Sequence, residues 1–296
     1  MNILKAALLG RSLGHSISPK VHEFLFDILR SKCDTDFDAL DYLKIECRDE
    51  TEFLLQVERG MIDGFRGFNI TFPYKYAASN IGREASSHVK QIRSANTILC
   101  ETPMRIISTD GDGFRFAIEK SCPDLSYNQY SLTILGAGGA ARAVLGAMWE
   151  LGWQKITVAA RSLEEARRSV LPYEGVSAVK LDEISRDAAR QFIVQATPVG
   201  QRTAESLLDD FEWRTGDIAV DLVYNPLLTR FLDHALIGGA RVIDGLGMLI
   251  EQAALSQYFW MTGNVADRSL LNDEEFYRSQ ASLSTLLIPR WDKFAT

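Results

Sequence analysis

The stretch Leu135-Gly136-Ala137-Gly138-Gly139-Ala140-Ala141-Arg142 follows a strand predicted over residues 132–135 and opens a helix predicted over residues 140–151. Gly136, Gly138 and Ala141 fit the pattern GxGxxA, whose glycines permit a tight turn and let the backbone approach a pyrophosphate. Amide groups at the helix N-terminus then face the negative charge. This strand–turn–helix context predicts a Rossmann-type dinucleotide-binding domain, and a structural turn without a ligand is the alternative.

Around this turn, short apolar runs alternate with helical patterns, which is typical of parallel sheets covered by helices. A chain of 296 residues is long enough for two domains that each bury a core. We therefore predict an α/β fold with a central cleft between two domains. Residues 1–112 would form a substrate-binding domain and residues 113–264 a dinucleotide-binding domain, with a C-terminal helix within about 265–296 packing back on the first.

The apolar periodicity locates the individual elements. Ser18 before Pro19 marks the start of the first helix, because serine and proline are favoured there. Strands are predicted at residues 3–9, 43–47, 65–70, 97–100, 104–107, 132–135, 155–159, 192–195, 218–222 and 241–243. Further helices are predicted at residues 51–61, 113–121, 140–151 and 249–262.

Composition narrows the functional classes. The net charge is −7 and no basic stripe is present, which argues against nucleic acid as a partner. Cys33, Cys47, Cys100 and Cys122 form no CxxC pair, so reduced thiols in a cytoplasmic protein are expected. No apolar stretch approaches the roughly 20 residues that cross a bilayer. No two histidines have metal-ligand spacing, so we expect no metal.

Two further stretches each present one residue suited to proton transfer: Gly67-Phe68-Asn69-Ile70-Thr71-Phe72-Pro73-Tyr74-Lys75 and Ser108-Thr109-Asp110-Gly111. Lys75 is predicted to begin a short helix and Asp110 to close a strand, so both are expected at the cleft. Hydride transfer to a ketone leaves an alkoxide that needs a proton, which a lysine oriented by a carboxylate can exchange. The pair indicates a dehydrogenase. The alternatives are an exposed helix lysine and a helix-capping aspartate.

The end of the strand that follows the glycine turn bears on the cofactor. It reads Ala159-Ala160-Arg161-Ser162, whereas NAD sites usually place an acidic residue there. A guanidinium at Arg161 would attract the 2′-phosphate of NADP, and Ser162 could add a hydroxyl donor. A solvated surface arginine is the alternative. Because Glu164 and Glu165 would weaken phosphate binding, NADP is favoured and NAD remains possible.

Several motifs resemble those of the shikimate dehydrogenase family, in the same order along nearly the whole chain. The matching stretches are Gly14 to His22, Gly67 to Lys75, Ala95-Asn96-Thr97-Ile98, Thr109-Asp110-Gly111, the glycine turn, Ala196 to Gly200, Val223-Tyr224-Asn225-Pro226, Asp244 to Leu249, and Gln252. The resemblance implies reversible, NADP-dependent reduction of 3-dehydroshikimate to shikimate in aromatic biosynthesis. The partner is then a small-molecule substrate, and the sequence leaves a monomer and a homodimer both open.

The resemblance assigns roles to the matching residues. Lys75 and Asp110 would form the catalytic pair. Ser16, Ser18 and Tyr224 would hold the substrate carboxylate, and ring hydroxyls would be bound by Asn69, Thr71, Asn96, Asp110 and Gln252. Gly245 and Met248 would lie beside the nicotinamide. The pyrophosphate would rest on Gly136, Ala137, Gly138, Gly139 and Ala140, with Arg161 and Ser162 at the 2′-phosphate.

The chain also departs from the family pattern. Glu23, Ser108 and Gln195 each replace an asparagine that is customary in the family. The family's cofactor-binding pattern Asn-Arg-Thr-x-x-Arg is replaced here by Ala160-Arg161-Ser162-Leu163-Glu164-Glu165. The loss of one basic residue leaves mixed use of NAD and NADP open, with Arg167 a possible compensation. Ser16 and Ser18 are both kept, which favours shikimate over quinate. The alternatives are a quinate or amino-analogue dehydrogenase and a non-catalytic sensor of shikimate-like acids.

Overall fold

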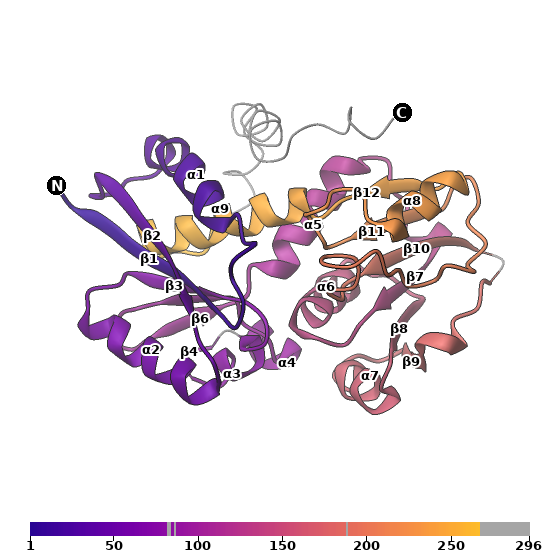
Figure 1. The fold of residues 1–296 in the computed structure, drawn as a ribbon, viewed down its shortest axis with the longest axis horizontal. Helices are drawn as coiled ribbons and strands as arrows, with labels where there is room; N and C mark the ends of the chain where they lie inside the picture. Colours follow the sequence, from indigo (N-terminus) through magenta and orange to yellow (C-terminus); the bar gives the residue numbers. More distant parts are fainter. Residues whose placement is uncertain (82–83, 86, 188, 267–296) are drawn as a thin grey trace. The chain divides into compact units, whose positions relative to one another are not determined.

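The computed structural model describes residues 1–81, 84–85, 87–187 and 189–266, and the chain divides into two compact units (Figure 1). Of the described residues, unit 1 comprises Met1–Thr109 and 250–266, and unit 2 comprises Asp110–Leu249. The second boundary therefore falls at residues 249/250, not at the predicted 264/265. The reason is that Ser256 and Trp260 bond to strands of unit 1. The helix predicted within about 265–296 lies outside the described residues, apart from its first two positions.

A six-stranded mixed sheet in the order β2-β1-β3-β5-β6-β4 forms the centre of unit 1. Its strands are β1 (Ile3–Gly10), β2 (Ala39–Glu46), β3 (Gly67–Ile70), β4 (Glu84–Ala85), β5 (Thr97–Leu99) and β6 (Arg105–Ile107). β1 pairs in parallel with both β2 and β3, whereas β5 runs antiparallel to β3 and β6. β1 is buried almost throughout, because a central parallel strand is covered on both faces.

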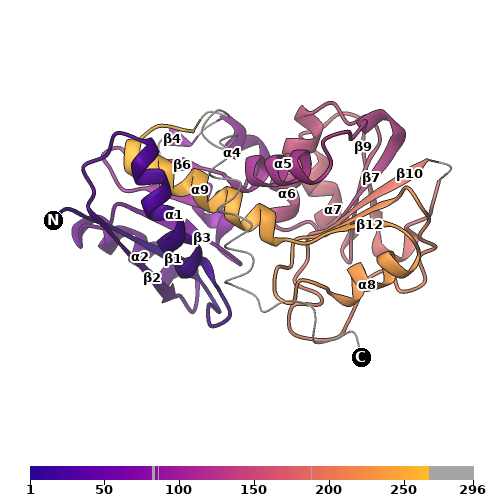
Figure 2. The ribbon, with the colours of Figure 1, turned by 90° about the horizontal axis from the view of Figure 1, so that it is seen from above.

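Helices cover this sheet and close its core. They are α1 (Ser18–Lys32), α2 (Glu50–Ile62), α3 (Lys75–Ala78), α4 (Ser87–Ile92) and most of α9 (Leu246–Thr262). α1 begins at Ser18 with Pro19 in its first turn, as predicted. α1 and α9 lie side by side (Figures 1 and 2), and Cys33 Sγ contacts Met261 Sδ at 3.8 Å.

The absence of a side chain at Gly67 lets Trp260 of α9 pack directly against the sheet. A Cβ atom at Gly67 would meet Trp260 Nε1 at 2.2 Å, so only glycine leaves the room that the indole occupies. Trp260 Nε1 donates to the Ile98 carbonyl at 2.9 Å, which joins α9 to β5. The C-terminal part of α9 is therefore an integral part of unit 1.

Unit 2 is a wholly parallel six-stranded sheet in the order β12-β11-β10-β7-β8-β9. Its strands are β7 (Tyr130–Leu135), β8 (Ile156–Ala160), β9 (Val176–Lys180), β10 (Arg190–Gln195), β11 (Ile218–Asp221) and β12 (Arg241–Ile243). The chain order reverses between β7 and β10, which is the switch point where doubly wound sheets bind ligands. The predicted Rossmann-type arrangement is thereby confirmed.

Four helices accompany this sheet: α5 (Asp110–Ser121), α6 (Gly139–Glu150), α7 (Leu163–Val170) and α8 (Arg230–Ile237). α6 and α7 cover one face, and α8 lies on the other (Figures 1 and 2). Short 3₁₀ turns occupy Tyr127–Gln129 and Leu181–Glu183. The second lies in the connection from β9 to β10.

Two helices begin three residues earlier than predicted. Asp110 does not close a strand but is the first residue of α5, three positions before the predicted start. Carboxylates are favoured in a first helical turn, and Asp112 follows in the same turn. α9 likewise begins at Leu246, with Asp244 Oδ1 accepting from Leu246 N at 2.9 Å. None of the helices in the described residues is long and apolar enough to span a membrane.

Candidate active site

Asn69 is the centre of a buried polar network in unit 1. Its amide nitrogen donates to Ser256 Oγ at 2.9 Å, to the Asn96 carbonyl at 3.2 Å and towards Thr97 Oγ1 at 3.3 Å. Its amide oxygen accepts from the Tyr42 hydroxyl at 2.9 Å. Both polar groups of Asn69 thus have partners within unit 1, which hold its side chain in place.

Three hydroxyl groups extend the network from Asn69. Ser256 Oγ lies 2.7 Å from Thr97 Oγ1 and 3.1 Å from Thr109 Oγ1, and all three side chains are buried. Ser256 also donates to the Gln252 carbonyl one turn earlier in α9, at 2.9 Å. Sequence reasoning missed all three hydroxyls. Ser256 nevertheless carried a signal, because a serine inside an apolar helix must be buried and bonded.

Asn96 and Gln252, two residues predicted to bind ring hydroxyls, meet in this network. Asn96 Nδ2 donates to Gln252 Oε1 at 3.2 Å and to Thr109 Oγ1 at 2.8 Å. Asn96 Oδ1 accepts from the Thr109 backbone N–H at 2.7 Å. Asp110 follows Thr109 by one trans peptide, so its Cα lies about 3.8 Å from that of Thr109. The network therefore fixes the backbone at the point where Asp110 enters α5.

Lys75 begins the short helix α3, as predicted. Its carbonyl accepts from Ala95 N at 2.9 Å, which places the Lys75 backbone beside the segment that carries Asn96. The preceding Tyr74 is buried, donates from its hydroxyl to the Cys47 carbonyl at 2.6 Å and stacks on Phe53. Thr71, a further predicted substrate ligand, is held by a bond from its N–H to the Leu9 carbonyl. Lys75 thus has a firmly anchored backbone.

The predicted carboxylate-binding serines lie together before and at the start of α1. Ser16 Oγ donates to Ser18 Oγ at 3.1 Å and accepts from the Ser18 N–H at 3.3 Å. Ser16 N in turn donates to the Leu13 carbonyl at 3.0 Å. The two hydroxyls therefore form one polar pair within unit 1.

His22 packs in the core of unit 1. It is fully buried and stacks on Tyr42 with ring centroids 4.2 Å apart. Burial lowers the pKa of His22 to about 4, so the imidazole is neutral at physiological pH. Because Tyr42 also bonds Asn69, the histidine supports the network through its stacking partner.

The glycine turn of unit 2 has the geometry that a dinucleotide requires. Gly138 caps α6 with extended backbone, and a Cβ atom there would meet nothing within 4 Å, so space is open in front of the turn. Gly136 N donates to the Ala159 carbonyl at 2.8 Å, which fixes the turn against β8. The remaining predicted pyrophosphate-binding residues, Ala137, Gly139 and Ala140, belong to the same turn and the first residues of α6. These residues fit a pyrophosphate at the helix N-terminus.

Arg161 and Ser162 lie between β8 and α7. Arg161 is exposed, and Ser162 caps α7 by accepting from Glu165 N at 3.3 Å, which leaves its hydroxyl proton available to another acceptor. Glu164 is paired with Arg168 one turn later in α7. This ion pair reduces the repulsion that Glu164 would exert on a phosphate.

A second buried network organises the loops beyond β10 and β11. Asp221 accepts from Val223 N at 2.9 Å, from Thr229 Oγ1 at 2.6 Å and from Gln195 Nε2 at 3.3 Å. Gln195 Oε1 also accepts from Thr197 N, so one amide ties both loops together. Burial raises the pKa of Asp221 to about 7. Sequence reasoning recorded Gln195 as a departure but missed Asp221.

Gly245 approaches the loop that carries Tyr224, and Met248 follows Gly245 by three residues, in α9. A Cβ atom at Gly245 would meet the Leu222 carbonyl oxygen at 2.3 Å, so glycine is required for this approach. Tyr224 lies in the loop that Asp221 holds through Val223 N. Met248 stands in the first turn of α9, four residues before Gln252 and hence on the same face of that helix.

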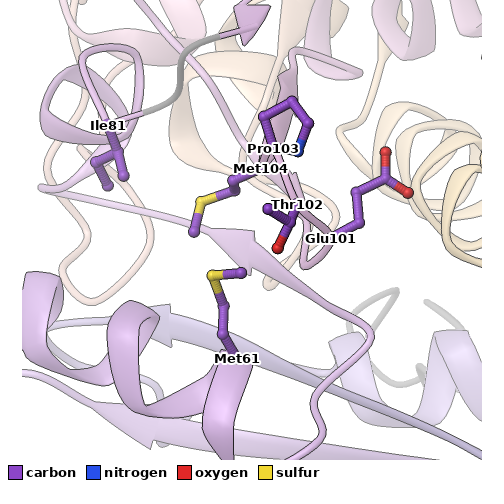
Figure 3. A pocket seen from close by; sticks show the side chains of 6 residues that line it. All are labelled: Met61, Ile81, Glu101, Thr102, Pro103 and Met104. Atoms are coloured by element: carbon purple, nitrogen blue, oxygen red, sulfur yellow. The ribbon is translucent and has the colours of Figure 1, made fainter.

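Two pockets lie away from these residues. One of about 260 Å³ in unit 1 is lined by side chains of Met61, Ile81, Glu101, Thr102, Pro103 and Met104, with the two methionines facing each other across it (Figure 3). The other, of about 360 Å³, lies at the N-terminal ends of β7, β8 and β9. Neither is lined by a predicted site residue, so neither identifies the site.

Together, the parallel sheet with its glycine turn and the second α/β unit with its buried amides and hydroxyls define a two-domain protein of the Rossmann dinucleotide-binding class. Residues 8–98 match the family described as the shikimate dehydrogenase substrate binding domain. An NADP(+) shikimate dehydrogenase of Mesorhizobium japonicum is 33% identical over 86% of this chain and 90% of its own length. The chain therefore belongs to the shikimate dehydrogenase family.

Solved structures give the same relationship. Shikimate 5-dehydrogenase from Thermus thermophilus, in complex with NADP(H) and shikimate, has a TM-score of 0.75 and 31% identity, covering 93% of this chain and 99% of that one. Quinate dehydrogenase from Corynebacterium glutamicum, in complex with NAD, has a TM-score of 0.78 at 25% identity, covering 96% of this chain and all of that one.

Proposed function

We propose that this protein is an NADP-dependent oxidoreductase that interconverts 3-dehydroshikimate and shikimate. The observation that carries the proposal is the network in which Asn96, Gln252 and Thr109 meet directly before Asp110. Neutral amides and hydroxyls in that arrangement suit a polyhydroxylated ring, since a buried hydrogen-bonding partner discriminates strongly against analogues that lack a hydroxyl. The identity to the Mesorhizobium enzyme along most of both chains supports the same activity.

In this proposal, Lys75 exchanges the proton at the substrate oxygen and Asp110 orients the lysine. Ser16, Ser18 and Tyr224 hold the carboxylate through their hydroxyls. Asn96, Gln252 and Thr71 bind ring hydroxyls, whereas Asn69 supports them through its bonds to the Asn96 carbonyl and to Ser256. The dinucleotide, when bound, supplies or accepts the hydride.

The residues of unit 2 fit a dinucleotide with a 2′-phosphate. Gly136 to Ala140 would hold the pyrophosphate, and Arg161 with the hydroxyl of Ser162 would hold the 2′-phosphate. Gly245 and Met248 would lie beside the nicotinamide ring. The pairing of Glu164 with Arg168 supports NADP, because it offsets one of the two acidic residues near Arg161.

Initial rates of oxidation of shikimate and of quinate, each with NADP and with NAD, test the proposal. We expect rapid turnover with shikimate and NADP only. Preference for quinate or NAD would support the second candidate, a quinate dehydrogenase, which the likeness to the Corynebacterium enzyme favours. Tight binding of shikimate without turnover in any combination would overturn both enzymatic functions in favour of a sensor.

A further inference from the structure

One face of the edge strand β2 contacts the elements that carry the predicted substrate ligands. Tyr42, Lys44 and Glu46 alternate along β2 and so point to the same side of the sheet. The Tyr42 hydroxyl donates to Asn69, and Glu46 Oε1 accepts from Leu13 N at 2.7 Å. Between them, Lys44 Nζ donates to the carbonyls of Leu13 at 3.1 Å and of Ser16 at 3.4 Å.

The ammonium group of Lys44 therefore lies beside the serine pair. It bonds the carbonyl of Ser16, whose own hydroxyl bonds Ser18, so roughly 5–7 Å separate the charge from the paired hydroxyls. Serine hydroxyls are neutral and cannot by themselves balance a carboxylate that leaves water. Among the described residues, Lys44 has two carbonyl partners and no carboxylate partner, so its charge is not neutralised by an ion pair.

We propose that Lys44 is a substrate-binding residue that attracts the carboxylate held by Ser16 and Ser18 and orders the loop that carries Ser16. The inference rests on the proposed function, since it takes the serine pair as the carboxylate site. At about 6 Å, the attraction between two opposite charges at a protein surface is stronger than in bulk water and suffices to change the affinity about 5- to 50-fold. This attraction acts in the substrate complex and in the transition state alike, so it lowers KM more than it changes kcat.

Lys44→Gln tests the role of the charge. We expect kcat/KM for shikimate to fall about 5- to 50-fold, mainly through KM, with KM for NADP unchanged. The uncharged methyl ester of shikimate should lose less than about 2-fold, and Lys44→Arg should restore most of the affinity for shikimate. The dependence of kcat/KM on ionic strength should also become shallower, because one attractive charge is removed.

Lys5→Gln is the matched control. Lys5 also donates to a backbone carbonyl, that of Asp63 at 3.4 Å, but it lies five positions before the end of β1, about 16 Å from Gly10. Glu46→Gln keeps an acceptor for Leu13 N while removing a negative charge, so it should lower KM for shikimate.

Three results would overturn the proposal: equal losses with shikimate and its ester, a Lys44→Gln effect no larger than that of Lys5→Gln, or a Glu46→Gln variant with a higher KM. The first would leave Lys44 only a structural role in the loop. If the native protein turns over none of the substrates, the proposed function fails by itself. Calorimetric binding of shikimate to native protein and Lys44→Gln then decides the role of Lys44 separately, with equal dissociation constants counting against it.

Discussion

The side-chain amide nitrogen of Asn69 lies 2.9 Å from the hydroxyl of Ser256, although the two residues are 187 positions apart in the sequence. Ser256 also contacts Thr97 and Thr109 and donates to the carbonyl of Gln252. A single hydroxyl of α9 thus joins β3, β5 and the residue before Asp110. The polar groups proposed to bind the substrate ring consequently depend on α9 for their positions.

Ser256→Ala should destabilise the protein and weaken substrate binding. Removing the hydroxyl deletes the buried hydrogen bonds that Ser256 Oγ makes with Asn69, Thr97 and Thr109, which costs about 1–3 kcal/mol of the free energy of unfolding. KM for shikimate should rise while KM for NADP stays the same, because only unit 1 is affected. Denaturant unfolding and steady-state kinetics measure the two effects. Ser31→Ala, which removes an exposed hydroxyl bonded to a helical carbonyl, should change neither, and equal behaviour of the two variants would contradict the role of Ser256.

Lys75→Ala should lower kcat by about 10²–10⁴-fold, the range for a positioned acid–base group, with a modest change in substrate binding. Steady-state rates with shikimate and NADP provide the measurement. Lys90→Ala removes another lysine from a helix of unit 1 and should leave kcat unchanged. Undiminished turnover in Lys75→Ala would remove the lysine from the mechanism.

Arg161→Ala should raise KM for NADP far more than KM for NAD, because only NADP carries a 2′-phosphate. Arg168→Ala provides the comparison, since it removes a cation from the same region and leaves Glu164 without its partner. Its effect on KM for NADP should have the same sign but be smaller. Identical ratios of the two Michaelis constants in Arg161→Ala and the native protein would exclude a contact with the phosphate.

Stability should depend on pH through Asp221. Its pKa is about 7 in the folded protein and near 3.8 in an unfolded chain, so the folded state holds the proton more tightly between these values. This contribution to the free energy of unfolding is present at low pH and is lost as the pH rises through about 7. His22 acts in the opposite sense, because its lowered pKa makes its contribution disappear as the pH falls from about 6.5 to about 4.

Asp221→Asn removes the contribution of Asp221 to the pH dependence of stability and leaves that of His22. Its free energy of unfolding should therefore fall more steeply than that of the native protein as the pH drops from about 6.5 to about 4. Urea unfolding at a series of pH values from about 4 to about 8 gives the comparison. Asp233→Asn, an exposed acid on α8, should follow the native curve. Parallel curves for Asp221→Asn and the native protein would refute the titration of Asp221 in this range.

Much of the fold could be predicted because its signals are local. The glycine turn is recognisable within eight residues, and its strand and helix are present as β7 and α6. α5 was harder to delimit, since Asp110-Gly111-Asp112-Gly113 contains two poor helix formers. Their place in the helix comes from packing: a Cβ atom at Gly111 would meet the Ala143 carbonyl at 2.9 Å, so α5 approaches α6 closely.

The polar networks could be predicted only in part, because their partners are distant in the sequence. Asn96 and Gln252 were recognisable from motifs, but Thr97 and Thr109 resemble ordinary strand residues until Ser256 is placed beside them. Lys44 likewise sits in a strand whose alternation predicts only an exposed face. Its neighbours become visible only when the pairing of β1 and β2 brings the loop after β1 to it.

The insertion of unit 2 between two parts of unit 1 imposes an order on biosynthesis. The strands of unit 1 leave the ribosome first, but Ser256 and Trp260 are translated only after the whole of Asp110–Leu249. Because synthesis proceeds at about 5–20 residues per second, the amides and carbonyls that later bond to these two side chains lack those partners for several seconds or longer. A nascent chain that has completed its nucleotide domain therefore still exposes the unfinished sheet of its N-terminal half to chaperones.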